Sequence, residues 1–193
     1  MPHDRSITLD PAAADVTTAR AIAEHATPTA ERTLRVLTWL ADEKLLLAAA
    51  IGASLYCRMD GRGVGAQRCA DQVLWNAVVS AALPHLLKRF VDRERPDRRV
   101  VHGRRHGIPR SGKRFDSFPS GHALHLGALA SALTRTGPSR LRPFIWPAAI
   151  GLASTRLLLL AHYVSDVVAG LVFGVATDRA IAALFARGPA RRK

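Results

Sequence analysis

Five apolar stretches interrupt an otherwise polar and basic sequence, and they restrict the folds open to this chain. They cover about residues 36–57, 72–87, 121–134, 143–162 and 164–186. Each stretch is longer than an ordinary strand, and none alternates strictly between apolar and polar residues. All five are therefore predicted to be helices, and the sequence predicts an all-α fold, a bundle of about five to six helices.

The distribution of charge favours a bundle embedded in a membrane. The 193 residues contain 28 Lys and Arg against 15 Asp and Glu, a formal charge of +13. These basic residues gather between and beyond the apolar stretches instead of following amphipathic helices. A spanning helix needs about 20 mostly apolar residues, whereas Arg156, Asp166 and Asp178 interrupt the stretches here. We expect a multi-pass protein of the cell (inner) membrane, and a tightly packed soluble bundle is the alternative.

The chain divides by composition into three segments. Residues 1–34 are polar and rich in alanine, which predicts a tail with an amphipathic helix that carries no chemistry. Residues 35–187 are expected to form one helical domain with one site, and residues 188–193 a basic C-terminal tail. The two cysteines, Cys57 and Cys69, lack the spacing of a zinc site or a disulfide framework.

A strongly basic loop, about residues 88–118, separates the second apolar stretch from the third. It has two interpretations: a cytoplasmic loop that obeys the positive-inside rule, or a set of side chains that hold a phosphate. The opposite ends of the helices are also basic, with Arg58, Arg62, Arg68, Arg135, Arg140, Arg142 and the C-terminal tail. We expect that second face to be cytoplasmic.

The sharpest local motif is Pro119-Ser120-Gly121-His122, at the start of the third apolar stretch. Serine is a favoured N-cap, and the first turn of a helix presents unpaired N–H groups and a partial positive charge. An anion bound against Ser120 and Gly121, with His122 beside it, is the functional interpretation. An ordinary helix cap is the structural one.

A second group of residues, Arg156, His162 and Asp166, contains the pattern of an oriented histidine. His162 and Asp166 are four residues apart, which would place them on one helix face within hydrogen-bonding reach. A carboxylate on one imidazole nitrogen leaves the other lone pair free to act as nucleophile or base. Six residues separate Arg156 from His162, so the two share a site only if the helix breaks near residues 158–164. A buried ion pair between Asp166 and Arg156 is the structural alternative.

Lys88 and Arg95 form a third basic group. They are seven residues apart, nearly two helical turns, so both are predicted on one helix face that Pro96 then ends. By itself, such a face is typical of a solvated surface.

In combination the three groups resemble the signature of the type-2 phosphatidic acid phosphatases. The matching residues are Lys88 with Arg95-Pro96, then Pro119-Ser120-Gly121-His122, then Arg156, His162 and Asp166, in the expected order and spacing. The wider superfamily includes bacterial acid phosphatases and vanadium haloperoxidases. One departure occurs before the third-motif arginine, where the usual serine is replaced by Thr155, which keeps a hydroxyl.

The resemblance implies a phosphatase that works through a phosphohistidine. His162 would attack phosphorus, Asp166 would steady the resulting imidazolium, and His122 would protonate the leaving oxygen. The phosphate oxygens would be bound by Lys88, Arg95, Ser120, Gly121 and Arg156. No cofactor or metal is expected, although His125 with Asp166 leaves a metal site as an alternative. The expected substrate is a phosphate monoester or pyrophosphate of a lipid, reached from the bilayer.

Other functions stay open at the level of sequence. A soluble acid phosphatase or a vanadate-dependent haloperoxidase would use the same pocket. A non-enzymatic basic membrane protein or nucleic-acid-binding protein would account for the charge but not for the ordered histidines, so no nucleic-acid partner is expected. The sequence specifies neither the lipid nor the oligomeric state.

Overall fold

The structure is a computed structural model that describes residues 6–39, 42–101, 112–137 and 139–187. The predicted basic tail and the middle of the basic loop lie outside the described residues. The helices are α1 (Ala13–His25), α2 (Pro28–Trp39), α3 (Glu43–Met59), α4 (Val64–Leu87), α5 (Pro96–Arg99), α6 (Gly121–Thr136), α7 (Arg142–Leu158) and α8 (Val164–Arg187). A short 3-10 helix covers Ser139–Leu141, and strands β1 (Ile7–Thr8) and β2 (Val91–Asp92) pair in parallel.

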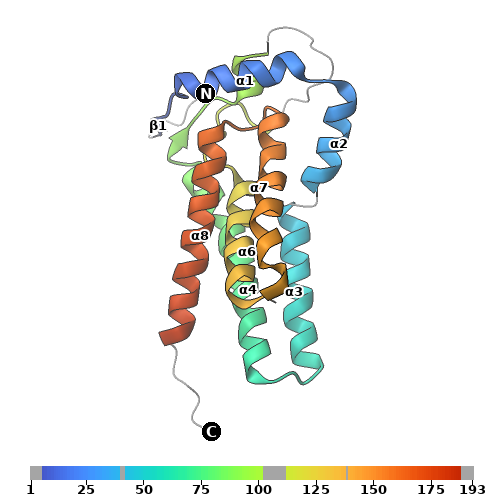
Figure 1. Ribbon diagram of the computed structural model, residues 1–193. Helices are drawn as coiled ribbons and strands as arrows, with labels where there is room; N and C mark the ends of the chain where they lie inside the picture. Colours follow the sequence, from blue (N-terminus) through green and yellow to red (C-terminus); the bar gives the residue numbers. More distant parts are fainter. Residues whose placement is uncertain (1–5, 40–41, 102–111, 138, 188–193) are drawn as a thin grey trace.

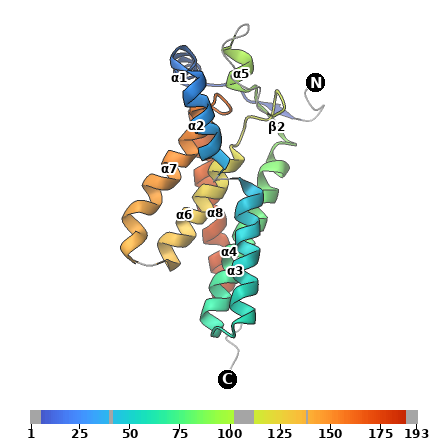
Figure 2. The same ribbon diagram turned by 90° about the vertical axis from the view of Figure 1, so that its right-hand side faces the viewer.

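Five of these helices, α3, α4, α6, α7 and α8, run along one another as an elongated bundle (Figure 1). Helix α1 lies across one end of this bundle, and α2 leads from it along α7 towards α3 (Figures 1 and 2). The bundle helices correspond to the five apolar stretches, so the predicted all-α fold is confirmed. The first stretch is divided, because the side chain of Asp42 accepts a bond from the Lys44 N–H and starts α3.

The backbones of helices α6 and α8 are in direct contact at glycine residues, with no room for a side chain between them. A Cβ atom placed on Gly174 would lie 2.1 Å from the Leu124 carbonyl oxygen. One placed on Gly127 would lie 2.4 Å from the Leu171 carbonyl oxygen. Glycine at these positions lets the two backbones touch, as small residues do in membrane bundles. The contact fixes the end of α6 that carries His122 against the end of α8 that carries Asp166.

Replacing Gly174 by alanine is expected to lower the stability of the bundle by about 2 kcal/mol or more, because the two helices must separate to admit the methyl group. Gly151 on α7 is the matched control, since a Cβ there meets nothing within 4 Å. Alanine at Gly151 is expected to be neutral or to stabilise the helix by up to about 1 kcal/mol. Thermal unfolding in detergent measures both. Equal midpoints for the two variants would contradict the close packing.

A buried polar cluster around Asp178 links three bundle helices, α4, α6 and α8. The Asp178 carboxylate is fully buried and accepts bonds from Asn76 of α4 at 2.8 Å, and from Ser131 and Arg135 of α6 at 2.7 and 2.8 Å. A buried carboxylate needs such partners. The charge that interrupts the last apolar stretch is thus satisfied inside the bundle.

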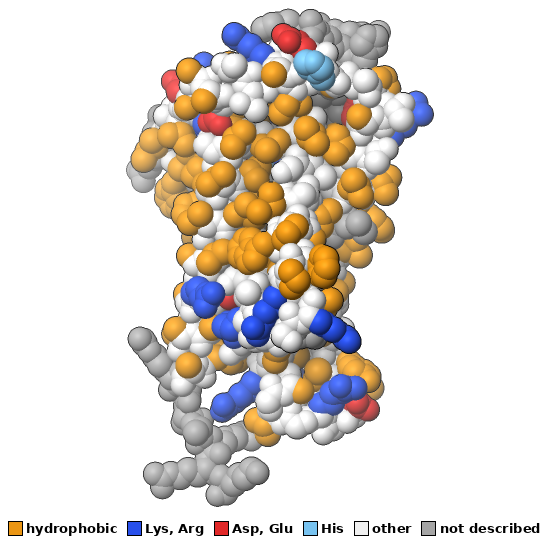
Figure 3. Space-filling view, in the orientation of Figure 1, with side chains coloured by type: hydrophobic (Ala, Val, Ile, Leu, Met, Phe, Trp, Pro, Cys, Tyr) orange, Lys and Arg blue, Asp and Glu red, His pale blue; other side chains and the backbone are white. Residues whose placement is uncertain are grey.

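The outer surface of the bundle is largely apolar. Figure 3 shows a broad belt of hydrophobic side chains, bordered on one side by a band of lysine and arginine. Exposed apolar residues come from several helices, including Leu55, Trp75, Phe144, Ile150 and Val172. One described helix, Val164–Ala186, is long and apolar enough to cross a bilayer by length and composition alone. The surface fits the membrane-embedded bundle that the sequence predicts.

Candidate active site

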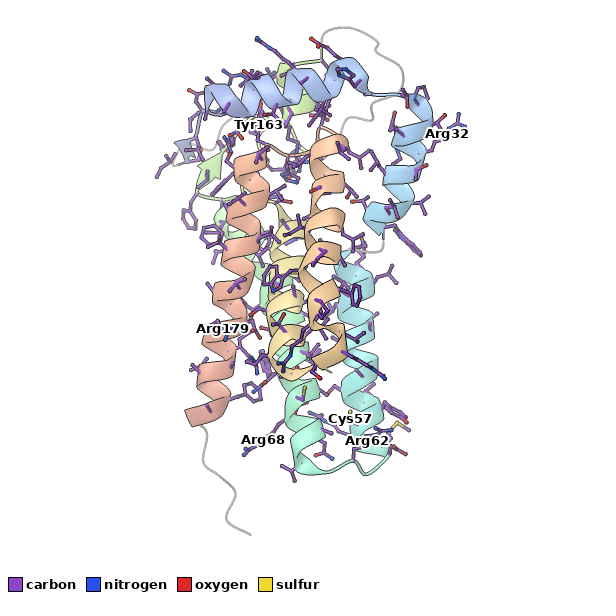
Figure 4. All side chains as sticks on the ribbon, in the orientation of Figure 1. Arg32, Cys57, Arg62, Arg68, Tyr163 and Arg179 are labelled. Atoms are coloured by element: carbon purple, nitrogen blue, oxygen red, sulfur yellow. The ribbon has the colours of Figure 1, made fainter. Side chains whose placement is uncertain are left out.

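The predicted site residues meet at the end of the bundle that α1 covers. Helix α7 ends at Leu158, the chain turns through Leu160 with φ 52°, and α8 begins at Val164. This break confirms the turn predicted near residues 158–164. Figure 4 shows Tyr163 in this connection, directly beneath α1. His162 therefore belongs to a short loop between two helices.

His162 is oriented by a backbone carbonyl. Its Nδ1 lies 2.6 Å from the Ser117 carbonyl oxygen, while Nδ1 and Asp166 Oδ2 are 3.9 Å apart. The predicted direct hydrogen bond to Asp166 is therefore wrong, because His162 precedes α8 and Asp166 lies in its first turn. The imidazole is still oriented, because a carbonyl oxygen can only accept a hydrogen bond, so the ring hydrogen sits on Nδ1 and is donated to Ser117. Nε2 keeps a free lone pair.

The electrostatic surroundings keep this imidazole neutral. His162 is 4% exposed. Burial, and then the positive charges of Arg95, Arg156 and Lys88, hold its pKa well below the ordinary 6.5. A neutral imidazole with a free Nε2 beside three cations is suited to attack an anionic electrophile.

Asp166 is hydrogen-bonded by three donors other than the imidazole. Arg93 Nη1 and Ser117 Oγ each lie 2.5 Å from its carboxylate, and the Tyr163 N–H lies 2.8 Å away. The carboxylate is fully buried. The predicted alternative of an ion pair with Arg156 is wrong, since the buried partner is Arg93. Asp166 shapes the loop around His162 and acts on it as a nearby negative charge.

Lys88 and Arg95 do not share a helix face, contrary to the sequence prediction. Helix α4 ends at Leu87, Lys88 caps it, and the chain passes through β2 before Arg95 caps α5. Pro96 starts α5 and does not end a helix. The two cations are nevertheless close, because both pair with Asp116. Its carboxylate lies 3.7 Å from Lys88 Nζ and 2.7 Å from Arg95 Nε. Burial lowers the pKa of Lys88, and Asp116 opposes that effect.

Arg156 differs from the other cations of the site in having no carboxylate partner among the described residues. Its buried Nε also has no hydrogen-bond partner there. An arginine is costly to bury without a counter-charge. Both Arg156 and Lys88 lie within electrostatic reach of His162 and of His122. The two histidines therefore lie near the same cationic side chains.

The start of α6 supplies backbone donors to this site. Ser120 caps the helix, with Oγ 3.4 Å from the Ala123 N–H, and its own N–H donates to the Asp166 carbonyl at 3.1 Å. Within the described residues, the N–H groups of Gly121 and His122 have no acceptor. They stand free at the positive end of the helix. The cap predicted at Ser120 is confirmed, and its place in phosphate binding stays a prediction.

The charges of the site suit a phosphate dianion. Lys88, Arg95 and Arg156 provide three cations, and Asp116 neutralises one of them. Two positive charges remain, which match the charge of an ionised phosphate monoester. In the part of the chain that the structure describes, no group of three or more histidine, cysteine, aspartate or glutamate residues could hold a metal ion.

Sequence reasoning missed four residues that build the site. They are Asp15, Arg93, Asp116 and Ser117, which come from α1 and from the two ends of the basic loop. Arg93 and Asp116 were present in the sequence as two more charges in a highly charged region. Asp15 gave no signal, because a single acidic residue in the first turn of a helix is an ordinary feature.

Fold and site together define a helical-bundle protein in which two histidines and three cationic side chains gather at one end of the bundle. The PAP2 superfamily model matches residues 72–188, and the chain belongs to that superfamily. The resemblance inferred from the motifs is thereby confirmed.

Two curated relatives carry the name lipid A 1-phosphatase. The protein from Rhizobium johnstonii is 41% identical over 116 residues, and that from Rhizobium etli is 45% identical over 98 residues. These matches cover 60% and 50% of this chain, but only 47% and 42% of the relatives. The chain thus matches less than half of each relative's length.

Two solved structures share the fold over nearly the whole chain. LpxE from Aquifex aeolicus superposes with a TM-score of 0.65 at 14% identity, covering 92% of this chain and 99% of that one. A transmembrane PAP2-type phosphatidylglycerolphosphate phosphatase from Bacillus subtilis gives 0.66 at 17% identity, covering 93% and 88%. Both show that the chain has their helical fold.

Proposed function

We propose that this protein is a membrane phosphatase that hydrolyses the phosphate of a lipid through a phosphohistidine. The observation that carries the proposal is His162 itself: a buried, neutral imidazole whose proton is held on Nδ1 by the Ser117 carbonyl, and which feels the positive charges of Arg95, Arg156 and Lys88. Family membership supports phosphate-ester chemistry, and the names of the curated relatives support a lipid substrate.

In the first step, Nε2 of His162 forms a bond to phosphorus as the bond from phosphorus to the ester oxygen breaks. Lys88, Arg95 and Arg156 neutralise the equatorial oxygens, which is the main requirement of phosphoryl transfer. His122, which the neighbouring phosphate dianion keeps protonated in the complex, donates that proton to the departing oxygen. The imidazolium formed on His162 is stabilised by the Ser117 carbonyl and by the negative charge of Asp166, 3.9 Å from Nδ1.

In the second step, water attacks the phosphohistidine and the bond between nitrogen and phosphorus breaks. His122, now neutral, accepts the proton of that water, and inorganic phosphate leaves the cations. The site lies at one end of an apolar bundle, where a phosphate headgroup can enter while its tails stay in the bilayer (Figure 3). A position in the inner membrane, with the band of arginines on the cytoplasmic side, is part of the proposal.

The proposal predicts phosphate release that needs no divalent cation. The protein is purified in detergent and incubated with phosphatidic acid, a polyprenyl phosphate and a phosphorylated glycolipid, with and without a chelator. Release from at least one lipid, unchanged by the chelator, is the expected result, because cationic side chains perform the role of a metal here. Loss of activity with the chelator would revive the metal alternative, and recovery of the protein without detergent would favour a soluble phosphatase.

A further inference from the structure

The N-terminal segment reaches the site through one buried carboxylate. Asp15, in the first turn of α1, is 6% exposed. Its Oδ2 lies 2.8 Å from Arg93 Nη2 and 2.5 Å from Ser165 Oγ, and its Oδ1 lies 3.1 Å from the Ser165 N–H. Burial alone would raise the pKa of Asp15, but Ser165 and Arg93 outweigh it, so the group stays ionised.

Arg93 is held between two carboxylates that come from opposite ends of the chain. One terminal nitrogen, Nη2, donates to Asp15, and the other, Nη1, donates to Asp166 at 2.5 Å and to Ser165 at 2.7 Å. The guanidinium also lies over the Tyr163 ring, 4.9 Å from its centroid. The arginine is 3% exposed, so these contacts replace nearly all of its hydration.

Two carboxylates on one guanidinium leave a net negative charge close to the loop of His162. With Asp166 as its only partner, the buried arginine would cancel the charge of that carboxylate. With Asp15 present, the triad of Asp15, Arg93 and Asp166 carries one negative charge. That charge opposes the positive surroundings of His162, namely Arg95, Arg156 and Lys88.

We propose that Asp15 is a positioning residue of the phosphatase site, which acts through Arg93 so that Asp166 can stabilise the positive imidazole of the phosphoenzyme. The inference rests on the proposed function. It assigns to α1 a part in turnover, although this helix contributes no group that touches the phosphate. Phosphate binding itself depends on Lys88, Arg95 and Arg156, which Asp15 does not contact.

The backbone of the same segment fixes the position of Asp15. The N–H groups of Ile7 and Leu9 donate to the carbonyls of Phe90 and Asp92 at 2.8 and 2.9 Å. This short parallel pairing brings the chain alongside Arg93 before α1 begins. Asp10, between the strand and the helix, points to solvent at 83% side-chain exposure and pairs with Arg99 at 3.3 Å. It supplies a matched control for the removal of one charge.

The test compares Asp15→Asn, Asp15→Glu and Asp10→Asn on the lipid phosphate that the wild type hydrolyses. Asparagine keeps the shape of Asp15 and removes its charge, whereas glutamate keeps the charge and adds a methylene. We expect kcat to fall about tenfold in Asp15→Asn. Asp15→Glu should retain more of kcat than Asp15→Asn, and Asp10→Asn should match the wild type. The inhibition constant of inorganic phosphate should stay within about twofold throughout, because its ligands are intact.

Several outcomes would overturn the inference. Wild-type kcat in Asp15→Asn would remove any role for the charge. An asparagine variant as active as the glutamate variant, or more so, would show that shape matters and charge does not. A parallel loss of phosphate affinity would indicate general disruption of the site. If Asp15→Asn does not fold, a folded Asp15→Glu with a tenfold weaker phosphate affinity would equally contradict it. Absence of phosphate release by the wild type would instead overturn the proposed function, and this inference with it.

Discussion

Glutamine in place of His162 is expected to lower kcat by about 10³-fold or more, because in the proposed mechanism this imidazole forms the bond to phosphorus. Glutamine can still donate an amide hydrogen to the Ser117 carbonyl, which His162 contacts at 2.6 Å, so the loop should keep its shape. Phosphate release from the lipid substrate measures the loss. Trapping with radiolabelled substrate, quenched in base, should give a labelled wild-type protein and an unlabelled variant.

The matched control for this substitution is His85→Gln. His85 lies in the last turn of α4 with 71% of its side chain exposed, and it contacts the Glu43 carboxylate at 4.0 Å. Its replacement should leave kcat unchanged. Substantial turnover by His162→Gln, or label retained on that variant, would rule out His162 as the nucleophile.

Lysine in place of Arg156 is expected to lower kcat/KM by about 100-fold although the positive charge is kept. The guanidinium can bond two phosphate oxygens with a planar fork, and a lysine ammonium cannot reproduce that geometry. Arg156 has no carboxylate partner among the described residues, so the loss falls on the substrate and not on an internal ion pair. Steady-state kinetics in detergent, with thermal unfolding alongside, separate the effect from misfolding.

Arg142→Lys provides the comparison within the same helix. Arg142 starts α7 at the opposite end of the bundle and is exposed. Both substitutions remove one guanidinium from α7 and retain one charge. Only the change at Arg156 should affect turnover, and equal activity of the two variants would contradict a bidentate phosphate contact.

The sequence predicted the fold well because apolar stretches of helical length leave few alternatives. It also located the break between α7 and α8, since Arg156 and His162 could share a site only if the helix ended between them. The prediction that two residue pairs each share a helix face was wrong, because a helix ends or begins between the members of each pair. Spacing reports contacts only within one continuous helix, and both pairs, Lys88 with Arg95 and His162 with Asp166, span a helix end.

The residues that orient the site were beyond reach of sequence patterns because they are contacts between distant segments. Asp166 is bonded by Arg93, 73 residues away, and by Ser117, 49 residues away. A backbone carbonyl, such as that of Ser117 on His162, has no signature in the side-chain sequence at all. Motifs name the groups that do chemistry, and tertiary structure supplies the groups that hold them.

The parallel pairing of β1 with β2 and the link from Asp15 to Ser165 have a consequence for biosynthesis. Asp15 leaves the ribosome early, yet its partner Ser165 lies 150 residues further along the chain. At about 5–20 residues per second, roughly 8 to 30 seconds of translation separate the two. A nascent chain therefore holds an incomplete site until its last helix has been made and packed, and the proposed activity can begin only once the whole bundle has assembled.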